Sequence, residues 1–255
     1  MGDSELGKLP RLKGFKTIIG MLDCETTSPD DLARSILLTA NKELYFLKDN
    51  SALLTAYWYL IRLTWDSKHI GLLNALENIN LPISAGSSVF SLSSAIKEAC
   101  KKDIDKLTHN PAIRELIGQS IQSTILNIVG PNVPTLFGAG PKELEEAFAK
   151  FSTKLAFAHL SRSFMSNILN RVFDYVIDRH VPLHDIQVDF KEALRNWSWE
   201  TCILVEKYSG DWYSKHNWKS EGNISKFETS RFVEFALSKL RKELGFVAEI
   251  TEVKK

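Results

Sequence analysis

The chain has few cysteines, and none of them is placed to form a familiar site. Its 255 residues contain three, Cys24, Cys100 and Cys202, which lie far apart and never in a C-x-x-C spacing. Neither a disulfide framework nor a cysteine zinc site is therefore expected. We predict reduced and mostly buried thiols, which is typical of a cytoplasmic protein.

Long hydrophobic runs are also missing. The apolar run near the N-terminus, residues 17–22, is too short for a secretory signal, and no stretch approaches the roughly 20 apolar residues that cross a bilayer. The start Met1-Gly2 has Leu6 where a myristoylation signal has Ser or Thr. We therefore expect a cytoplasmic protein that makes no membrane contact.

No excess of charge of either sign is present. The 32 Lys and Arg residues nearly balance the 31 Asp and Glu residues, so no global field favours nucleic acid, although a local patch could still do so. This balance argues against a dedicated binder of duplex DNA. With 44% hydrophobic residues, the chain is instead able to build an ordinary globular core.

Two common catalytic motifs are absent from the sequence. It contains no G-x-x-x-x-G-K-[ST] phosphate-binding loop and no G-x-S-x-G nucleophile turn. No other stretch indicates a bound prosthetic group. We therefore expect no cofactor and leave open whether the protein is an enzyme.

Helical signals dominate what is present. Apolar residues recur three or four positions apart, and capping residues such as Ser28 and Asn110 stand directly before a proline at the first helical position. These patterns predict an all-α bundle of about seven to eight helices. The expected helices cover residues 28–47, a stretch from 51 onward, and residues 67–78, 92–107, 110–129, 142–178, 185–208 and 225–245, with a loop over 209–223.

A Pro- and Gly-rich segment, residues 130–141, interrupts the helical pattern and is expected not to be helical. It predicts two packed helical subdomains, residues 1–129 and 142–245, joined by this linker. The weakly alternating tail, residues 246–255, follows the second subdomain. Residues 142–178 have no internal Pro or Gly and are expected to form one long central helix.

Arg162 lies within an apolar stripe of this expected long helix, between Leu155 and Met165, with His159 one turn earlier. A buried cation needs a carboxylate or several carbonyls as partners, because an unpaired interior charge is not tolerated. Glu146 is too many turns away, so the partner is expected on another helix. The alternatives are a structural ion pair and a grip on a phosphate or carboxylate ligand.

Residues 179–184 bring together residue types that are suited to chemistry. Arg179 is followed by the polar His180, and His184 stands five positions after the arginine. This six-residue stretch resembles the R-x4-6-H motif of HEPN-type ribonucleases, which are all-helical proteins. The resemblance implies metal-independent RNA cleavage, with His184 as general acid or base and Arg179 stabilising the phosphorane charge, usually across a dimer.

The alternative for the same residues is a solvated turn between two helices. Pro182 favours this turn because it pushes Val181 out of the helical region. Two histidines four positions apart chelate one ion only on a continuous helix, so the proline also argues against a metal site at His180 and His184. We expect no bound metal.

The expected loop after residue 208 interleaves aromatic and basic side chains over residues 211–219. This composition suits base stacking and phosphate neutralisation on RNA or single-stranded DNA. The alternatives are that the aromatic rings anchor the loop on the core or contact a partner protein. The residues concerned are Trp212, Tyr213, Lys215, His216, Trp218 and Lys219.

The function favoured by the sequence is a non-enzymatic helical module that binds another protein, or itself, within a larger assembly. The first alternative is a HEPN-like ribonuclease that acts through Arg179 and His184. The second is an RNA- or single-stranded-DNA-binding accessory protein that uses the aromatic and basic residues 211–219.

Overall fold

The computed structural model describes residues 13–22, 24, 26–44, 51–82, 84, 88–108, 110–134, 139–180, 188–215 and 226–243. Within these ranges every regular element is a helix, so the all-α prediction is confirmed, although more helices are present than the seven to eight expected. In chain order they are α1 Lys13–Leu22, α2 Pro29–Leu44, α3 Ser51–His69, α4 Leu72–Asn78, α5 Val89–Asp105, α6 Pro111–Thr124, the π-helix η2 Ile125–Val129, the 3-10 helix η3 Gly130–Asn132, α7 Pro141–Ala149, α8 Lys154–His180, α9 Val188–Thr201, α10 Ile203–Lys215 and α11 Lys226–Glu243.

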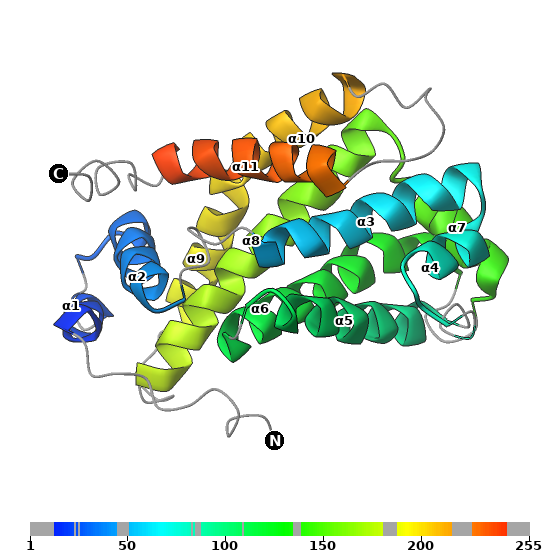
Figure 1. Ribbon diagram of the computed structural model, residues 1–255. Coiled ribbons are helices and arrows are strands. Elements are labelled where there is room, and N and C mark those ends of the chain that lie inside the picture. Colours follow the sequence, from blue (N-terminus) through cyan, green and yellow to red (C-terminus); the bar gives the residue numbers. More distant parts are fainter. Residues whose placement is uncertain are drawn as a thin grey trace, which may run out of the picture.

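Helix α8 is the centre of the fold. It packs against α2, α6, α9 and α10, and Figure 1 shows it crossing the middle of the molecule between α1 and α2 on one side and α3 to α7 on the other. Both of its apolar faces are buried along most of their length, as the two hydrophobic stripes in the sequence require, although Leu155 in its first turn is 79% exposed. The remaining helices are therefore arranged around α8.

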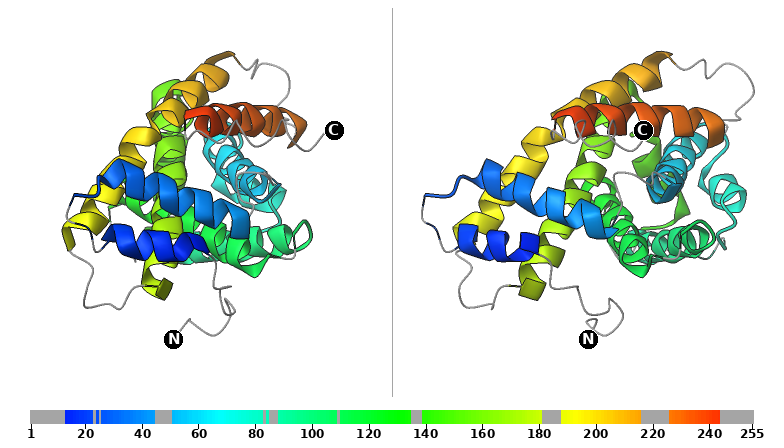
Figure 2. Two further views of the ribbon diagram at one scale, coloured as in Figure 1. Left: turned by 90° about the vertical axis from the view of Figure 1, so that its left-hand side faces the viewer. Right: turned by 60° about the vertical axis from the view of Figure 1, so that its left-hand side comes forward.

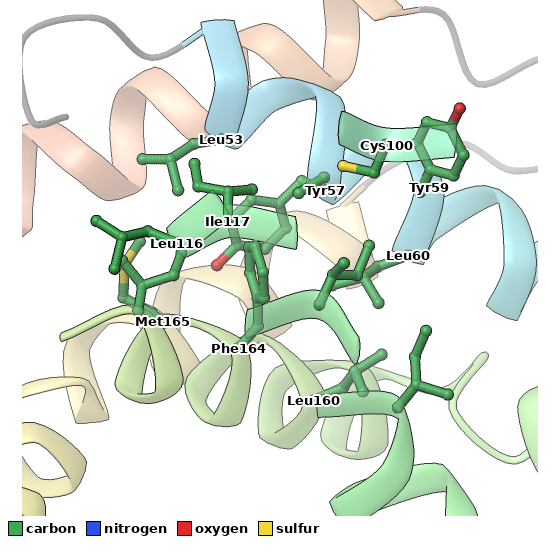
Figure 3. Close-up of a cluster of buried hydrophobic side chains, with 14 of the residues drawn as sticks. Leu53, Tyr57, Tyr59, Leu60, Cys100, Leu116, Ile117, Leu160, Phe164 and Met165 are labelled. Atoms are coloured by element: carbon green, nitrogen blue, oxygen red, sulfur yellow. The ribbon is translucent and has the colours of Figure 1, made fainter. Parts of the chain in front are cut away.

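One hydrophobic core joins the parts of the chain that precede and follow residues 130–141. The ring of Tyr57 in α3 meets Phe164 in α8 and Phe232 in α11 edge-on, with centroids 5.1 and 5.2 Å apart. Figure 3 shows Tyr57 and Phe164 in the same buried cluster as Leu116 and Ile117 of α6. The expected pair of packed subdomains is therefore not matched exactly, because the buried residues of the two halves belong to one core.

The Pro- and Gly-rich segment is helical at its start, contrary to expectation. Helix α6 continues into η2 and then into η3, which ends at Asn132. The N–H of Val133 still donates to the carbonyl of Gly130 at 3.1 Å. Proline is tolerated at Pro131 because the first residues of a helix need no intrahelical N–H bond.

The expected long helix of residues 142–178 is two helices, α7 and α8. The Ser152 hydroxyl donates to the carbonyl of Ala149 at 2.7 Å, and the Thr153 hydroxyl accepts from the N–H of Ala156 at 3.4 Å. Hydroxyl side chains compete in this way with the helical backbone, and they end one helix and begin the next without proline or glycine.

Two further boundaries differ from expectation. Helix α3 extends to His69, and α4 starts only after Gly71, whose φ of 89° lies in the left-handed region that favours glycine. The Glu145 carboxylate of α7 then accepts from the N–H of Leu72 at 2.8 Å and caps α4. Local sequence patterns cannot identify a capping residue that is so distant in sequence. Helix α1 was also not predicted.

Two predicted caps are confirmed. The Ser28 hydroxyl accepts from the N–H of Asp31 at 3.1 Å at the start of α2. The Asn110 side chain accepts from the N–H groups of Ala112 and Ile113 at 3.0 and 3.2 Å at the start of α6.

Close packing of α10 on α8 depends on Gly210, because a Cβ there would lie 3.3 Å from the Cβ of Ala158. We expect Gly210→Leu to lower the free energy of unfolding by about 1–3 kcal/mol, measured by urea denaturation, because the larger side chain overpacks this contact. The matched control is Gly20→Leu in α1, where an added Cβ meets nothing within 4 Å. Equal stability of both variants would contradict the role of Gly210.

Candidate functional site

A cluster of charged side chains around the nearly buried Arg162 lies where α8 passes the junction of α9 and α10. The expected single helix over residues 185–208 is two helices here. Helix α9 ends at Thr201 and α10 begins at Ile203, with Cys202 between them. Cys202 is fully buried, and its N–H donates to the carbonyl of Ser198 at 3.1 Å. Its own carbonyl accepts from the N–H of Glu206 at 3.2 Å.

Arg162 projects from α8 into this junction and is only 8% exposed. Its Nε donates to the carbonyl oxygen of Trp199 at 2.9 Å, and its Nη1 lies 2.7 Å from Oε2 of Glu206. The guanidinium carbon lies 4.1 Å from the ring centroid of Trp199, which is a cation–π contact. Its Nη2 also lies 3.6 Å from Oε1 of the exposed Glu200.

These contacts match the electrostatics of the two helix ends. The last carbonyls of α9 carry partial negative charge, and the first amides of α10 carry partial positive charge. Arg162 binds one of those carbonyls, and Glu206 lies in the first turn of α10. Each charge therefore lies at the helix end that stabilises it, and the two charges also pair with each other.

Two more groups border this junction. His159 Nδ1 lies 3.9 Å from Oε1 of Glu206, and the His159 ring meets Trp199 edge-on at 5.5 Å. Burial raises the pKa of the Cys202 thiol, and Arg162 lowers it by a smaller amount. The thiol is therefore protonated at neutral pH and is unsuited to act as a nucleophile.

The arrangement favours the structural ion pair over the ligand grip for Arg162. Two of its donors bind protein oxygens, and one face of its guanidinium is covered by an indole ring. As predicted, its partners come from other helices. Trp199 and Glu206 were not identified as partners from the sequence, although their spacing of seven positions puts them on one face of the helix expected over residues 185–208.

The aromatic residues of the expected loop 211–219 lie in α10 as far as the structure describes them. The Tyr213 ring is 4% exposed and stacks on Phe157 at 4.9 Å, and Trp212 stacks on Phe232 at 4.7 Å. The loop boundary was therefore wrong up to Lys215, the last residue of α10. The Lys215 side chain and His216, Trp218 and Lys219 lie outside the described residues.

Of the residues that resemble the ribonuclease motif, Arg179 lies in the last turn of α8. Its side chain and His184 lie outside the described residues, so their geometry stays a prediction. Directly before Arg179 in the chain, Asp178 Oδ1 binds Lys191 Nζ at 2.9 Å. Burial raises the pKa of the Asp174 carboxyl, and the nearby negative charge of Asp178 raises it further.

The raised pKa of Asp174 gives a pH-dependent prediction. A carboxyl whose pKa is higher in the folded state contributes stability at low pH, and this contribution is lost as pH rises through that pKa. We expect Asp174→Asn to raise the melting temperature relative to wild type at pH 7 and to have less effect near pH 3. Thermal scans at both pH values measure this, and a lower melting temperature at pH 7 would contradict the burial argument.

Removal of the Arg162 guanidinium tests the junction. We expect Arg162→Met to lower the free energy of unfolding by about 1–3 kcal/mol in urea, because Glu206 and the Trp199 carbonyl lose their donor. Lys154→Met is the matched control, since Lys154 also pairs α8 with α10, through Asp211, but both side chains are about half exposed. That exposed pair contributes at most about 1 kcal/mol. Equal effects of the two substitutions would contradict a special role for Arg162.

Comparison of the chain with protein-family models, with curated proteins and with solved structures finds no significant match. Within the ranges that the structure describes, no helix is both long and apolar enough to cross a membrane. Among the same residues, no three metal-binding side chains are grouped to hold an ion.

Proposed function

We propose that the protein is a non-enzymatic helical module that binds another protein, or a second copy of itself, within a larger cytoplasmic assembly. A surface patch on α10 and α11, built around the half-exposed ring of Phe235, supports this proposal most directly. We call it the α10–α11 patch, and it consists of Tyr208, Phe235 and Lys239.

The geometry of the α10–α11 patch resembles that of a protein-binding surface. Phe235 is 49% exposed, and the Tyr208 ring meets it edge-on with centroids 5.0 Å apart. Lys239 Nζ lies 5.4 and 5.9 Å from the two ring centroids. Aromatic side chains are enriched in the buried centres of protein interfaces, because each removes a large apolar area from water.

The contacts of the other candidate binding residues also support binding through the protein surface. Arg162, Trp212 and Tyr213, which the sequence put forward as ligand-binding residues, bind or stack on other parts of this chain. Their side chains therefore contribute to the stability of the fold. The half-exposed Phe235 adds less, because much of its ring stays in contact with water.

Phe235→Glu tests the proposal. If the patch is an interface between copies, wild-type protein elutes in size exclusion with light scattering at a mass above that of one chain. The variant should then shift to one chain, with affinity lowered by at least about tenfold, because a carboxylate is costly to bury in an interface. The matched control is Phe90→Glu on α5, because Phe90 is also 49% exposed but lies on another helix.

Two results would contradict these expectations in different ways. A control variant that dissociates as readily as Phe235→Glu would contradict the choice of patch. A wild-type protein that is monomeric at every concentration and carries no stoichiometric protein partner through purification would contradict the proposed function itself.

A further inference from the structure

Helices α1, α2 and α9 form a layer at one side of the molecule, and this layer is attached to the remaining helices mainly through α8. They pack in sequence, α1 on α2 and α2 on α9, and both α2 and α9 pack on α8. Figure 2 shows α1 and α2 lying across α8, away from α3. Beyond these contacts, α9 meets α10 at the Cys202 junction. The layer is therefore held mainly by α8 and by that junction.

A hydrogen bond between side chains joins α2 to α9 within this layer. The indole Nε1 of Trp197 in α9 donates to Oδ1 of Asp30 in α2 at 2.7 Å, and Arg34 pairs with the same carboxylate at 2.8 Å. These two bonds hold the pKa of Asp30 below its usual value. The Trp197 ring also lies 5.9 Å from Phe173 of α8, so it contacts both the layer and the helix beneath it.

The junction has the properties of a hinge. The regular helical run ends at Thr201 and restarts at Ile203, so a change in direction needs to alter few backbone torsions near Cys202. Arg162 binds both sides of this break, the Trp199 carbonyl on α9 and the Glu206 carboxylate on α10. One side chain from α8 therefore bridges the two helices, together with the backbone bonds that Cys202 makes to Ser198 and Glu206.

We propose that α1, α2 and α9 form a lid that opens from α8 about the Cys202 junction, with Arg162 as its latch. Opening separates Trp197 from Phe173 and admits solvent to Cys202. The core of α3, α5, α6, α8, α10 and α11 keeps its own contacts, such as those of Tyr57 with Phe164 and Phe232. This conformational device does not depend on the α10–α11 patch.

The three cysteines provide a built-in assay for the lid. Cys24 is exposed, Cys202 is buried at the proposed hinge, and Cys100 is buried in α5, away from the lid. In native buffer with excess thiol reagent, and with each site assigned by mass spectrometry, Cys24 should react first. We expect Cys202 to react at least about tenfold faster than Cys100, because lid opening costs less free energy than global unfolding.

Substitutions in α5 and α8 distinguish lid opening from global unfolding. Leu92→Ala removes a fully buried side chain of α5, so it should speed the labelling of Cys100 at least about tenfold and leave Cys202 within about twofold. Arg162→Met should speed the labelling of Cys202 at least about tenfold, and Lys154→Met should change it by less than about threefold. If Arg162→Met fails to fold, Arg162→Lys keeps a positive charge beside Glu206 but loses the guanidinium that binds the Trp199 carbonyl of α9, and it should also speed the labelling of Cys202.

Equal labelling rates of Cys202 and Cys100 in wild type, with both sites accelerated together by Leu92→Ala, would overturn the lid. Hydrogen exchange supplies the second measurement. The lid predicts that backbone amides of α2 and α9 share one opening free energy, below that of α3 and α10. Protection of α2 up to the global limit while α9 exchanges early would reject movement of the two helices as one unit.

Discussion

Arg162 lies where the carbonyl end of α9 meets the amide end of α10, and its ion pair with Glu206 compensates both partial charges at once. The geometry is demanding because a nearly buried guanidinium needs oxygen partners, and here they come from both sides of one helix break. The direction in which α10 leaves α9 is therefore tied to the position of α8. That direction decides which side chains of α10 reach the core.

The aromatic core follows from this placement. With α10 held against α8, Tyr213 stacks on Phe157 and Trp212 stacks on Phe232. Phe232 in turn meets Tyr57, so the contacts pass from α10 through α11 to α3. Residues whose types suggested ligand binding thus contribute to packing, whereas Phe235 on the outer side of α11 remains half exposed.

Local signals predicted the capped helix starts correctly but missed several helix breaks. Ser28 and Asn110 cap their helices as expected because a cap bonds to amides two or three residues away. The breaks near Ser152 and at Cys202 were missed because hydrophobic spacing continues when two successive helices bury the same face. For the candidate site, the burial of Arg162 and its need for a partner on another helix were predicted, but the partner was not.

The sequence by itself determined the all-helical class, the capped helix starts and the absence of familiar catalytic motifs, because each depends on residues close together in the chain. The tertiary structure decided that the two halves share one core, that Tyr213 is buried and that Arg162 pairs with Glu206. These features depend on residues far apart in the chain, whose meeting is set by how whole helices pack around α8 and not by any local pattern.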